Sequence, residues 1–157
     1  MKIKVVAVGR LKADYARDGC AEFVRRVGRH LDVEVVEVRD VPRRKNADID
    51  ACKAAEAELL RAAIPSGAHV VALDERGRGW TSRAFADYIG RLRDRAVPAL
   101  VFLIGGPDGL DPTLRDSADE VWALSKLTMS HELARLVLAE QLYRAAAILD
   151  GLPYHRD

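Results

Sequence analysis

The chain has 157 residues, of which 49% are hydrophobic and 31% charged, a composition typical of a folded domain and not of a disordered segment. Its 25 lysines and arginines nearly balance 24 aspartates and glutamates. The resulting net charge of +1 argues against a strongly basic nucleic-acid-binding coat but still permits a local basic patch. We expect residues 1–157 to form a single domain.

Membrane insertion, secretion and a metal centre are not expected. The longest charge-free stretch, residues 96–107, is too short for a membrane span, which takes about 20 residues. The opening segment, residues 1–8, is typical of a strand and lacks the longer apolar core and cleavage site of a signal peptide. Cys20 and Cys52 stand alone, without Cys-x-x-Cys or zinc-site spacing. We therefore expect a soluble, reduced, metal-free protein of the cytoplasm.

Apolar strand-like segments alternate with helical patterns along the chain. Strands are expected at 2–8, 33–38, 68–73, 99–104 and, briefly, 120–123. Helices are expected at 13–27, at 46–63, from a cap at Ser82 to about 95, and from a cap at Ser130 to a stop at Asp150-Gly151. The strand at 99–104 is the most apolar, as expected at the centre of a parallel sheet. This order predicts a three-layer α/β domain with a mostly parallel sheet.

The last predicted helix is apolar on nearly every face, which indicates that more than one side is covered. The residues responsible are Leu133, Leu136, Val137, Leu138, Leu142, Ile148 and Leu149, with several alanines. The cover could be the protein's own sheet, a partner subunit, or both.

Two glycine-containing loops directly follow predicted strands, at 73–79 and 104–110. Ligands of open α/β sheets bind beyond the carboxyl ends of strands. Because Gly105 and Gly106 have no Cβ, a ligand could lie directly against this backbone, although a plain tight turn is the commoner explanation of such a pair. Neither loop has the spacing of a P-loop or of a dinucleotide-binding fingerprint.

Hydrolytic chemistry has little support in the sequence. No Gly-x-Ser-x-Gly nucleophile elbow is present, and His131-Glu132 lacks the second histidine of a zinc-protease helix. Asp74 and Glu75 have the chemistry of an acid–base pair, but adjacent residues at a strand end are expected to point to opposite sides. A plain α/β hydrolase is therefore disfavoured.

The last residues bring three functional groups together after Pro153, which stiffens the exit from the helix. Tyr154 supplies a phenol, His155 an imidazole that titrates near neutral pH, and Arg156 a guanidinium suited to phosphate. From the residues alone, a disordered tail and a functional site are equally open.

A basic cluster lies in the connection after the second predicted strand. It consists of Arg39, Arg43, Arg44 and Lys45. From the residues alone, an ordinary solvated loop is the favoured interpretation of this cluster.

Six segments together resemble those of one known family. They are VAVG at 6–9, KNADI at 45–49, LIGGPDGL at 103–110, LSKLTMSH at 124–131, LAEQLYRA at 138–145 and PYHR at 153–156. The family is the RlmH family of bacterial ribosomal large-subunit pseudouridine N3-methyltransferases, which belongs to the small SPOUT methyltransferases. The resemblance extends over the whole chain, and several separate motifs agree.

The resemblance implies a deep trefoil knot in the C-terminal half, a feature that general topology rules would reject. It further implies that loops of the knot hold S-adenosyl-L-methionine in a bent form and that the protein works as a homodimer. The implied reaction is methylation of N3 of a pseudouridine in 23S rRNA of the assembled ribosome.

The resemblance also implies which residues form the site. The expected cofactor contacts are Leu73, Gly105, Gly106, Leu124, Ser125, Lys126, Leu127, Thr128 and Met129. Tyr154, His155 and Arg156 are expected beside the transferred methyl group. His155 is expected to accept the N3 proton, directly or through water, and Arg156 to stabilise the developing charge or hold a phosphate. Tyr154 is expected to orient the base or stack on it.

In the light of the resemblance, basic side chains are candidates for contacts with rRNA phosphates. These are Arg43, Arg44, Lys45 and Arg144, together with Arg25, Arg26 and Arg29. Two other functions stay open. One is a non-catalytic nucleotide- or ribosome-binding factor, for which the tail would be dispensable. The other is a SPOUT methyltransferase with a different RNA substrate, against which the terminal Tyr-His-Arg argues.

Overall fold

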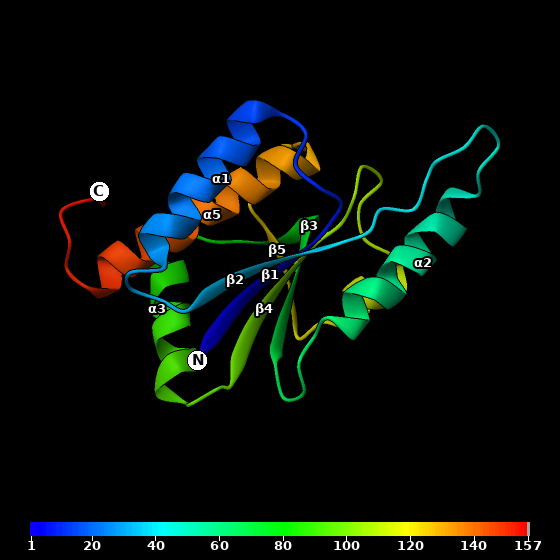
Figure 1. The fold of residues 1–157 in the computed structure, drawn as a ribbon. Helices are drawn as coiled ribbons and strands as arrows, with labels where there is room; N and C mark the ends of the chain where they lie inside the picture. The colour runs from blue at the N-terminus through cyan, green and yellow to red at the C-terminus, as the bar shows by residue number, and fades with distance from the viewer. Residues whose placement is uncertain (157) are drawn as a thin grey trace.

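The molecule is built on a sheet of five parallel strands in the order β2-β1-β4-β3-β5, with helices on both faces (Figure 1). The structure, a computed structural model, describes residues 1–156. The strands are β1 (Lys2–Val8), β2 (Val33–Val38), β3 (His69–Gly79), β4 (Ala99–Ile104) and β5 (Glu120–Ala123). The helices are α1 (Asp14–Val27), α2 (Ile49–Ala62), α3 (Ser82–Asp94), α4 (Pro112–Ser117) and α5 (His131–Leu149). This architecture confirms the predicted α/β class.

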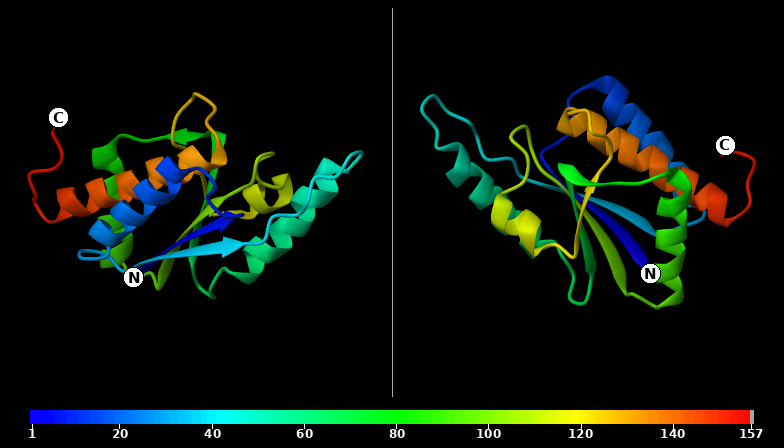
Figure 2. Two further views of the ribbon diagram at one scale, coloured as in Figure 1. Left: turned by 45° about the horizontal axis from the view of Figure 1, so that its top comes forward. Right: turned by 180° about the vertical axis from the view of Figure 1, so that it is seen from behind.

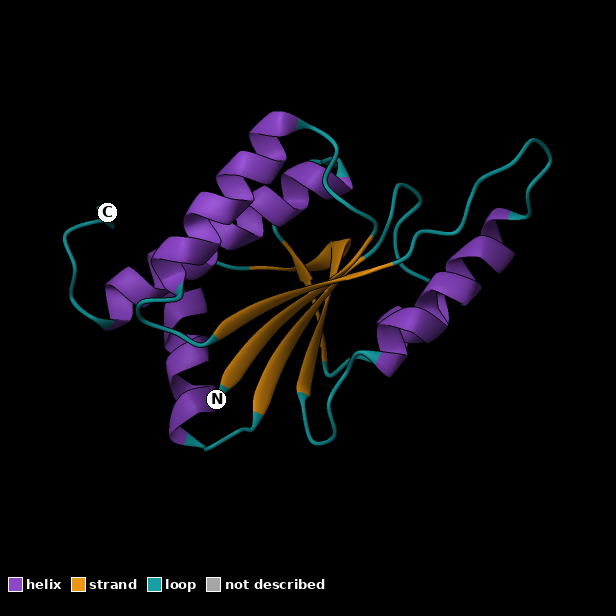
Figure 3. Ribbon diagram, in the orientation of Figure 1, coloured by secondary structure: helices purple, strands orange, loops and turns teal. Residues whose placement is uncertain are grey.

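Two apolar cores lie on opposite faces of the sheet, because successive side chains of a strand point to opposite sides. In β1, Ile3, Val5 and Ala7 belong to the core beneath α1, α3 and α5, whereas Val6 and Val8 belong to the core beneath α2 and α4. Figure 3 shows the helices separated by the sheet in this way. All of β4 is buried, as predicted for the central strand.

Four of the predicted strands coincide with β1, β2, β4 and β5, but β3 is longer than predicted. The polar run that begins at Asp74 was expected to end the strand. The backbone instead bulges there and pairs with β5 a second time, so that Leu73 and Arg78 both have Trp122 as their partner. This bulge matters for the site, because it redirects the side chains that follow Leu73.

Side chains at the helix starts explain where three helices begin. Ser130 caps α5, as predicted, whereas Thr81 and not Ser82 caps α3. Asp48 caps α2, which therefore begins at Ile49 and not at residue 46. In each case the side-chain oxygen accepts a hydrogen bond from the backbone N–H three residues later, which satisfies a donor left open at the helix start.

The apolar helix α5 is covered largely within its own chain. It lies on the sheet between α1 and α3 (Figure 1), and both neighbours approach it closely at a glycine. A Cβ on Gly19 of α1 would lie 2.6 Å from Leu136, and one on Gly90 of α3 would lie 3.2 Å from Leu149. Within residues 1–156 neither α5 nor any other helix has the length and hydropathy needed to cross a membrane.

The short helix α4 was not expected from the sequence, although its start carries a clear signal. Asp111 accepts hydrogen bonds from the backbone N–H groups of Thr113 and Leu114 at 2.9 and 3.1 Å, and Pro112 occupies the first turn. An aspartate cap followed by proline is a typical helix start.

Replacing Asp111 by alanine is expected to lower the free energy of unfolding by about 1 kcal/mol, because two N–H groups lose their acceptor. Asp116→Ala is the matched control, since this carboxylate lies in the last turn of α4 and is 65% exposed. The control should change the free energy of unfolding by less than about 0.5 kcal/mol. Urea denaturation measures both variants, and equal losses would contradict the capping role.

Candidate functional site

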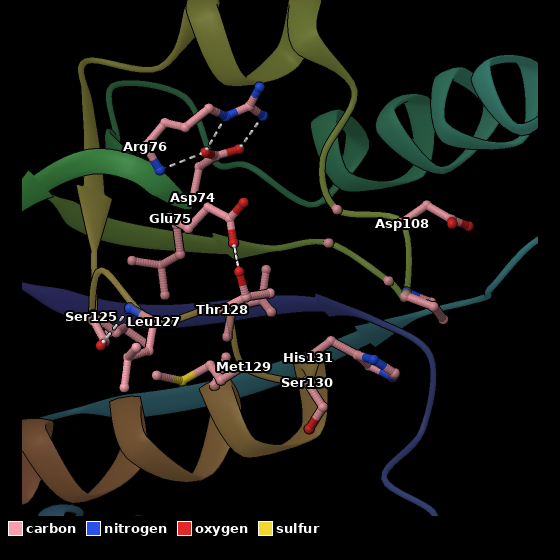
Figure 4. A pocket seen from close by; sticks show the side chains of 18 residues that line it. Asp74, Glu75, Arg76, Asp108, Ser125, Leu127, Thr128, Met129, Ser130 and His131 are labelled. Carbon is pink, nitrogen blue, oxygen red and sulfur yellow. Dashed lines mark hydrogen bonds and ion pairs between the residues drawn. The ribbon is translucent and has the colours of Figure 1, made fainter.

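A cavity of about 580 Å³ opens at the bulge of β3 and the carboxyl end of β4. Three parts of the chain surround it (Figure 4): residues 73–76 in β3, residues 104–109 from the end of β4 into the following turn, and residues 124, 125 and 127–131 from the loop after β5 into the start of α5. Ligands of open α/β sheets bind at this edge, and ligand pockets typically measure about 300–1,000 Å³. The cavity therefore lies at the two glycine-containing loops that were considered from the sequence as a candidate ligand site.

Most of the predicted cofactor contacts line this cavity. They are Leu73, Gly105, Gly106, Leu124, Ser125, Leu127, Thr128 and Met129. Lys126 lies outside the lining, because it is exposed on a turn in which the N–H of Leu127 donates to Oγ of Ser125 at 2.9 Å. Its contact with the cofactor stays a prediction.

The glycines after β4 are required by the loop itself. A Cβ on Gly105 would lie 2.4 Å from the carbonyl carbon of Gly109, a distance that real Cβ atoms do not tolerate. The loop closes by a hydrogen bond of 3.0 Å from the N–H of Gly109 to the carbonyl of Gly106, and Gly109 has φ of +80°. The explanation of a tight turn therefore holds for this loop, and the turn also forms one wall of the cavity.

Two neighbouring carboxylates, Asp74 and Glu75, both line the cavity, contrary to the expectation that they point to opposite sides. The bulge in β3 explains the difference. Asp74 accepts three hydrogen bonds of 2.9 Å from Arg76, which lower the pKa of Asp74 to about 2. Glu75 accepts a hydrogen bond from the hydroxyl of Thr128, on the opposite wall (Figure 4).

The tail residues pack on the second half of α5. The Tyr154 hydroxyl donates to Glu140 at 3.1 Å, and its ring lies 4.7 Å from the ring of Tyr143 and 4.9 Å from the guanidinium of Arg144. Nη1 of Arg144 lies 3.3 Å from Nδ1 of His155. Burial and the bond to Glu140 raise the pKa of Tyr154. Two motifs that the sequence presented separately, LAEQLYRA and PYHR, thus form one cluster.

The C-terminal tail and the loop between β5 and α5, which lines the cavity, lie at opposite ends of α5 (Figure 2). The first turn of α5 lines the cavity, whereas the tail follows its last turn. A helix of 19 residues is about 28 Å long, at about 1.5 Å per residue. Within one chain, the structure therefore does not place Tyr154, His155 and Arg156 beside the predicted cofactor contacts.

Arg43 is engaged inside the protein. Its Nε donates to Asp108 at 3.0 Å and its Nη2 to Glu56 at 3.1 Å, while Nη1 donates to both Glu56 and the carbonyl of Val41. Glu56 is only 2% exposed, and Asp108 belongs to the glycine loop after β4. These ion pairs raise the pKa of Arg43. Arg43 thus joins α2 to the wall of the cavity, which argues against its predicted contact with rRNA.

The other basic candidates fall into two groups. Arg44 and Lys45 are exposed in the connection between β2 and α2, and Arg29 is exposed after α1. Arg25 and Arg26 instead form ion pairs of 2.8 and 2.6 Å with a glutamate of their own helix. Arg144, in the tail cluster, pairs with Glu140 at 2.5 Å.

Sequence reasoning missed the acidic partners that organise these basic groups. They are Glu56, Asp108 and Glu140. Glu140 lies four residues before Arg144, a spacing that predicts an ion pair on a helix. Glu56 and Asp108 carry no such signal, because each meets Arg43 only through the tertiary fold.

The fold and the cavity define an α/β protein with a ligand site at the carboxyl edge of a parallel sheet, and comparison with known proteins gives the family. The family model described as "Predicted SPOUT methyltransferase" matches residues 1–155. The chain belongs to the SPOUT methyltransferase family.

Curated relatives match over nearly the full length of both chains. A protein of Phenylobacterium zucineum is 52% identical and covers 100% of each chain, and one of Brucella anthropi is 46% identical and covers 99% of each. Both are named "Ribosomal RNA large subunit methyltransferase H". The crystal structure of a probable methyltransferase from Bordetella pertussis is 16% identical, with a TM-score of 0.58 over 92% of this chain and 96% of that one. That likeness supports the fold.

Family membership implies the trefoil knot expected from the sequence and, for a methyltransferase, a methyl-donating cofactor. The cavity suits such a group, because it combines apolar side chains such as Leu73, Leu124 and Met129 with hydroxyl and carboxylate groups. Among residues 1–156, no group of three or more His, Cys, Asp or Glu side chains is placed to hold a metal ion.

Replacing Arg43 by alanine is expected to lower the free energy of unfolding by about 3 kcal/mol, because it leaves the buried carboxylate of Glu56 without its partner. Arg44→Ala is the control, since the neighbouring side chain is exposed, and it should cost less than about 0.5 kcal/mol. Urea denaturation of the two variants, and of Arg43→Ala combined with Glu56→Gln, measures the effect. A double variant no more stable than Arg43→Ala alone would contradict this explanation.

Proposed function

We propose that the chain transfers a methyl group from S-adenosyl-L-methionine to N3 of a pseudouridine in 23S rRNA of the assembled ribosome, working as a homodimer in the cytoplasm. The observation that carries the proposal is the cavity at the bulge of β3 and the carboxyl end of β4, lined by the motifs of an RNA-modifying family. The relatives, identical to this chain at 46% and 52% of positions and named as large-subunit rRNA methyltransferases, support the same reaction.

The proposed cofactor site uses the three walls of the cavity. When bound, the cofactor supplies a methyl group activated by a sulfonium. Leu73, Leu124 and Met129 offer apolar surface, and the turn at 105–109 offers backbone groups that no side chain covers. These residues position the cofactor, which is the main requirement for an in-line methyl transfer.

A second copy of the chain is needed to bring the tail to the cavity, because α5 separates the two by about 28 Å within one chain. A twofold axis places the tail of one subunit at the cavity of the other if the two α5 helices run in opposite directions. Leu127, Leu133 and Tyr15, at 79%, 38% and 61% exposure, offer apolar surface for this contact. They lie at one end of the molecule, where Glu132 accepts a hydrogen bond from the N–H of Ala13 at 3.1 Å.

In this arrangement, the tail supplies the groups that act on the base. N3–H of pseudouridine is a weakly acidic imide, so transfer requires a proton acceptor, and His155 is our candidate. Arg144 has only donors, so its contact with Nδ1 of His155 is a hydrogen bond when that nitrogen is the acceptor. Arg156 stabilises the developing charge or holds a phosphate, and Tyr154 orients the base.

Replacing His155 by alanine is expected to lower the rate of methyl transfer by about 100-fold or more, because general base catalysis is lost. The affinity for S-adenosylmethionine should stay within about two-fold, since the proposed cofactor contacts lie on the walls of the cavity and not on the tail. Transfer of labelled methyl groups to ribosomes lacking the modification, together with calorimetric titration of the cofactor, measures both quantities. A large loss of cofactor affinity at an unchanged rate constant would instead assign His155 to the cofactor site.

Replacing the exposed Arg44 and Lys45 by glutamate is expected to raise the apparent Michaelis constant for ribosomes about ten-fold or more, because two phosphate contacts become repulsive. The effect should shrink as the salt concentration rises. Asp50→Ala, another surface change near the start of α2, serves as the control. An unchanged Michaelis constant for ribosomes in the Arg44 and Lys45 variant would contradict the proposed phosphate contacts and support the interpretation of an ordinary solvated loop.

A further inference from the structure

Three carboxylates line the cavity, and two of them are paired with arginine. Asp74 lies 2.9 Å from Arg76 and 3.6 Å from Arg115, and Asp108 lies 3.0 Å from Arg43. Glu75 differs: within residues 1–156 its partner is the neutral hydroxyl of Thr128, and no basic side chain forms an ion pair with it. Of these three carboxylates, Glu75 is therefore the one without an ion pair, although the guanidinium of Arg76, which Asp74 holds, is close enough to interact with its charge.

The position of Glu75 directs this charge into the cavity. Thr128 belongs to the loop between β5 and α5, on the wall opposite β3, so the hydrogen bond between the two residues crosses the space that they enclose (Figure 4). Asp108, in contrast, points away from the other labelled side chains. Only Oε2 of Glu75 takes part in the bond to Thr128. Oε1 accepts no hydrogen bond from the described residues and is available to a ligand.

From this geometry we infer that Glu75 is the counter-ion for a positive charge of the bound cofactor, and that Thr128 holds the carboxylate in place. The inference rests on the proposed function, since it takes S-adenosylmethionine as the ligand. That cofactor carries two positive groups, the sulfonium and the α-ammonium. Attraction between opposite charges is stronger in a cavity with apolar walls than in open water. Glu75 is thus a binding residue that selects a charged cofactor, distinct from the acid–base role considered above for the pair Asp74 and Glu75.

The test is Glu75→Gln, which removes the charge but keeps the shape of the side chain and an oxygen that can accept from Thr128. Calorimetric titration compares S-adenosylmethionine, S-adenosylhomocysteine, which lacks the sulfonium, and 5′-methylthioadenosine, which lacks both positive groups. The affinity for S-adenosylmethionine should fall about five-fold, as for one ion pair in a partly solvated site. The affinity for 5′-methylthioadenosine should not change.

The response of S-adenosylhomocysteine identifies which positive group pairs with Glu75. Unchanged affinity assigns the sulfonium, and a loss equal to that of S-adenosylmethionine assigns the ammonium. Equal losses for all three ligands would overturn the inference, because Glu75 would then act only by holding the loop through Thr128. No change for any ligand would overturn it as well.

Two further variants make the result specific. Glu58→Gln removes the same charge from α2, where the side chain is 78% exposed, and should leave all three affinities unchanged. Thr128→Val removes the hydroxyl but keeps the charge of Glu75, so it should lower the ratio between the affinities for S-adenosylmethionine and 5′-methylthioadenosine less than Glu75→Gln does. The wild-type titration separates the two proposals. If the wild type binds none of the ligands, the proposed function fails. If the wild type binds them and Glu75→Gln binds all three with the same affinities, only the counter-ion role of Glu75 is overturned.

Discussion

The closure of the turn after β4 is the constraint on which the site depends. A side chain at Gly105 has no room, because the backbone of Gly109 lies where a Cβ would be. The turn can therefore fold back sharply at the end of the most buried strand, and its outer surface becomes a wall of the cavity. Arg43 forms ion pairs both with Asp108 of this turn and with the buried Glu56, and so connects the turn to α2. The shape of the cavity thus depends on packing and on one ion-pair network.

The same arrangement places the cavity and the C-terminal tail at opposite ends of α5. Its first turn lines the cavity, and its second half holds the tail through Glu140, Tyr143 and Arg144. Because one helix of 19 residues connects them, a single chain keeps the proposed cofactor site and the tail apart. A homodimer resolves this separation, so the proposed chemistry and the proposed assembly depend on each other.

Much of the fold was predictable because its signals are local. Apolar runs and alternation gave four strands with their bounds, and Ser130 gave the start of α5. The extension of β3 was not predictable, because the bulge depends on pairing with β5, which is distant in sequence. The site was predicted through motif resemblance, and residue chemistry alone left a tight turn as the better explanation of the glycines. The internal role of Arg43 was beyond sequence reasoning, since its partners come from α2 and from the turn after β4.

The most direct test of the account is a mixed dimer made from two inactive subunits. One subunit lacks residues 154–157, and the other carries Gly105→Val, which blocks the turn that forms the cavity wall. Methyl transfer from labelled S-adenosylmethionine to unmodified ribosomes is measured for each homodimer and for the co-expressed, purified heterodimer. The account predicts two inactive homodimers and a heterodimer with about half the activity of the wild type, because one cavity meets one intact tail. An inactive heterodimer that still binds the cofactor would contradict a site shared between subunits.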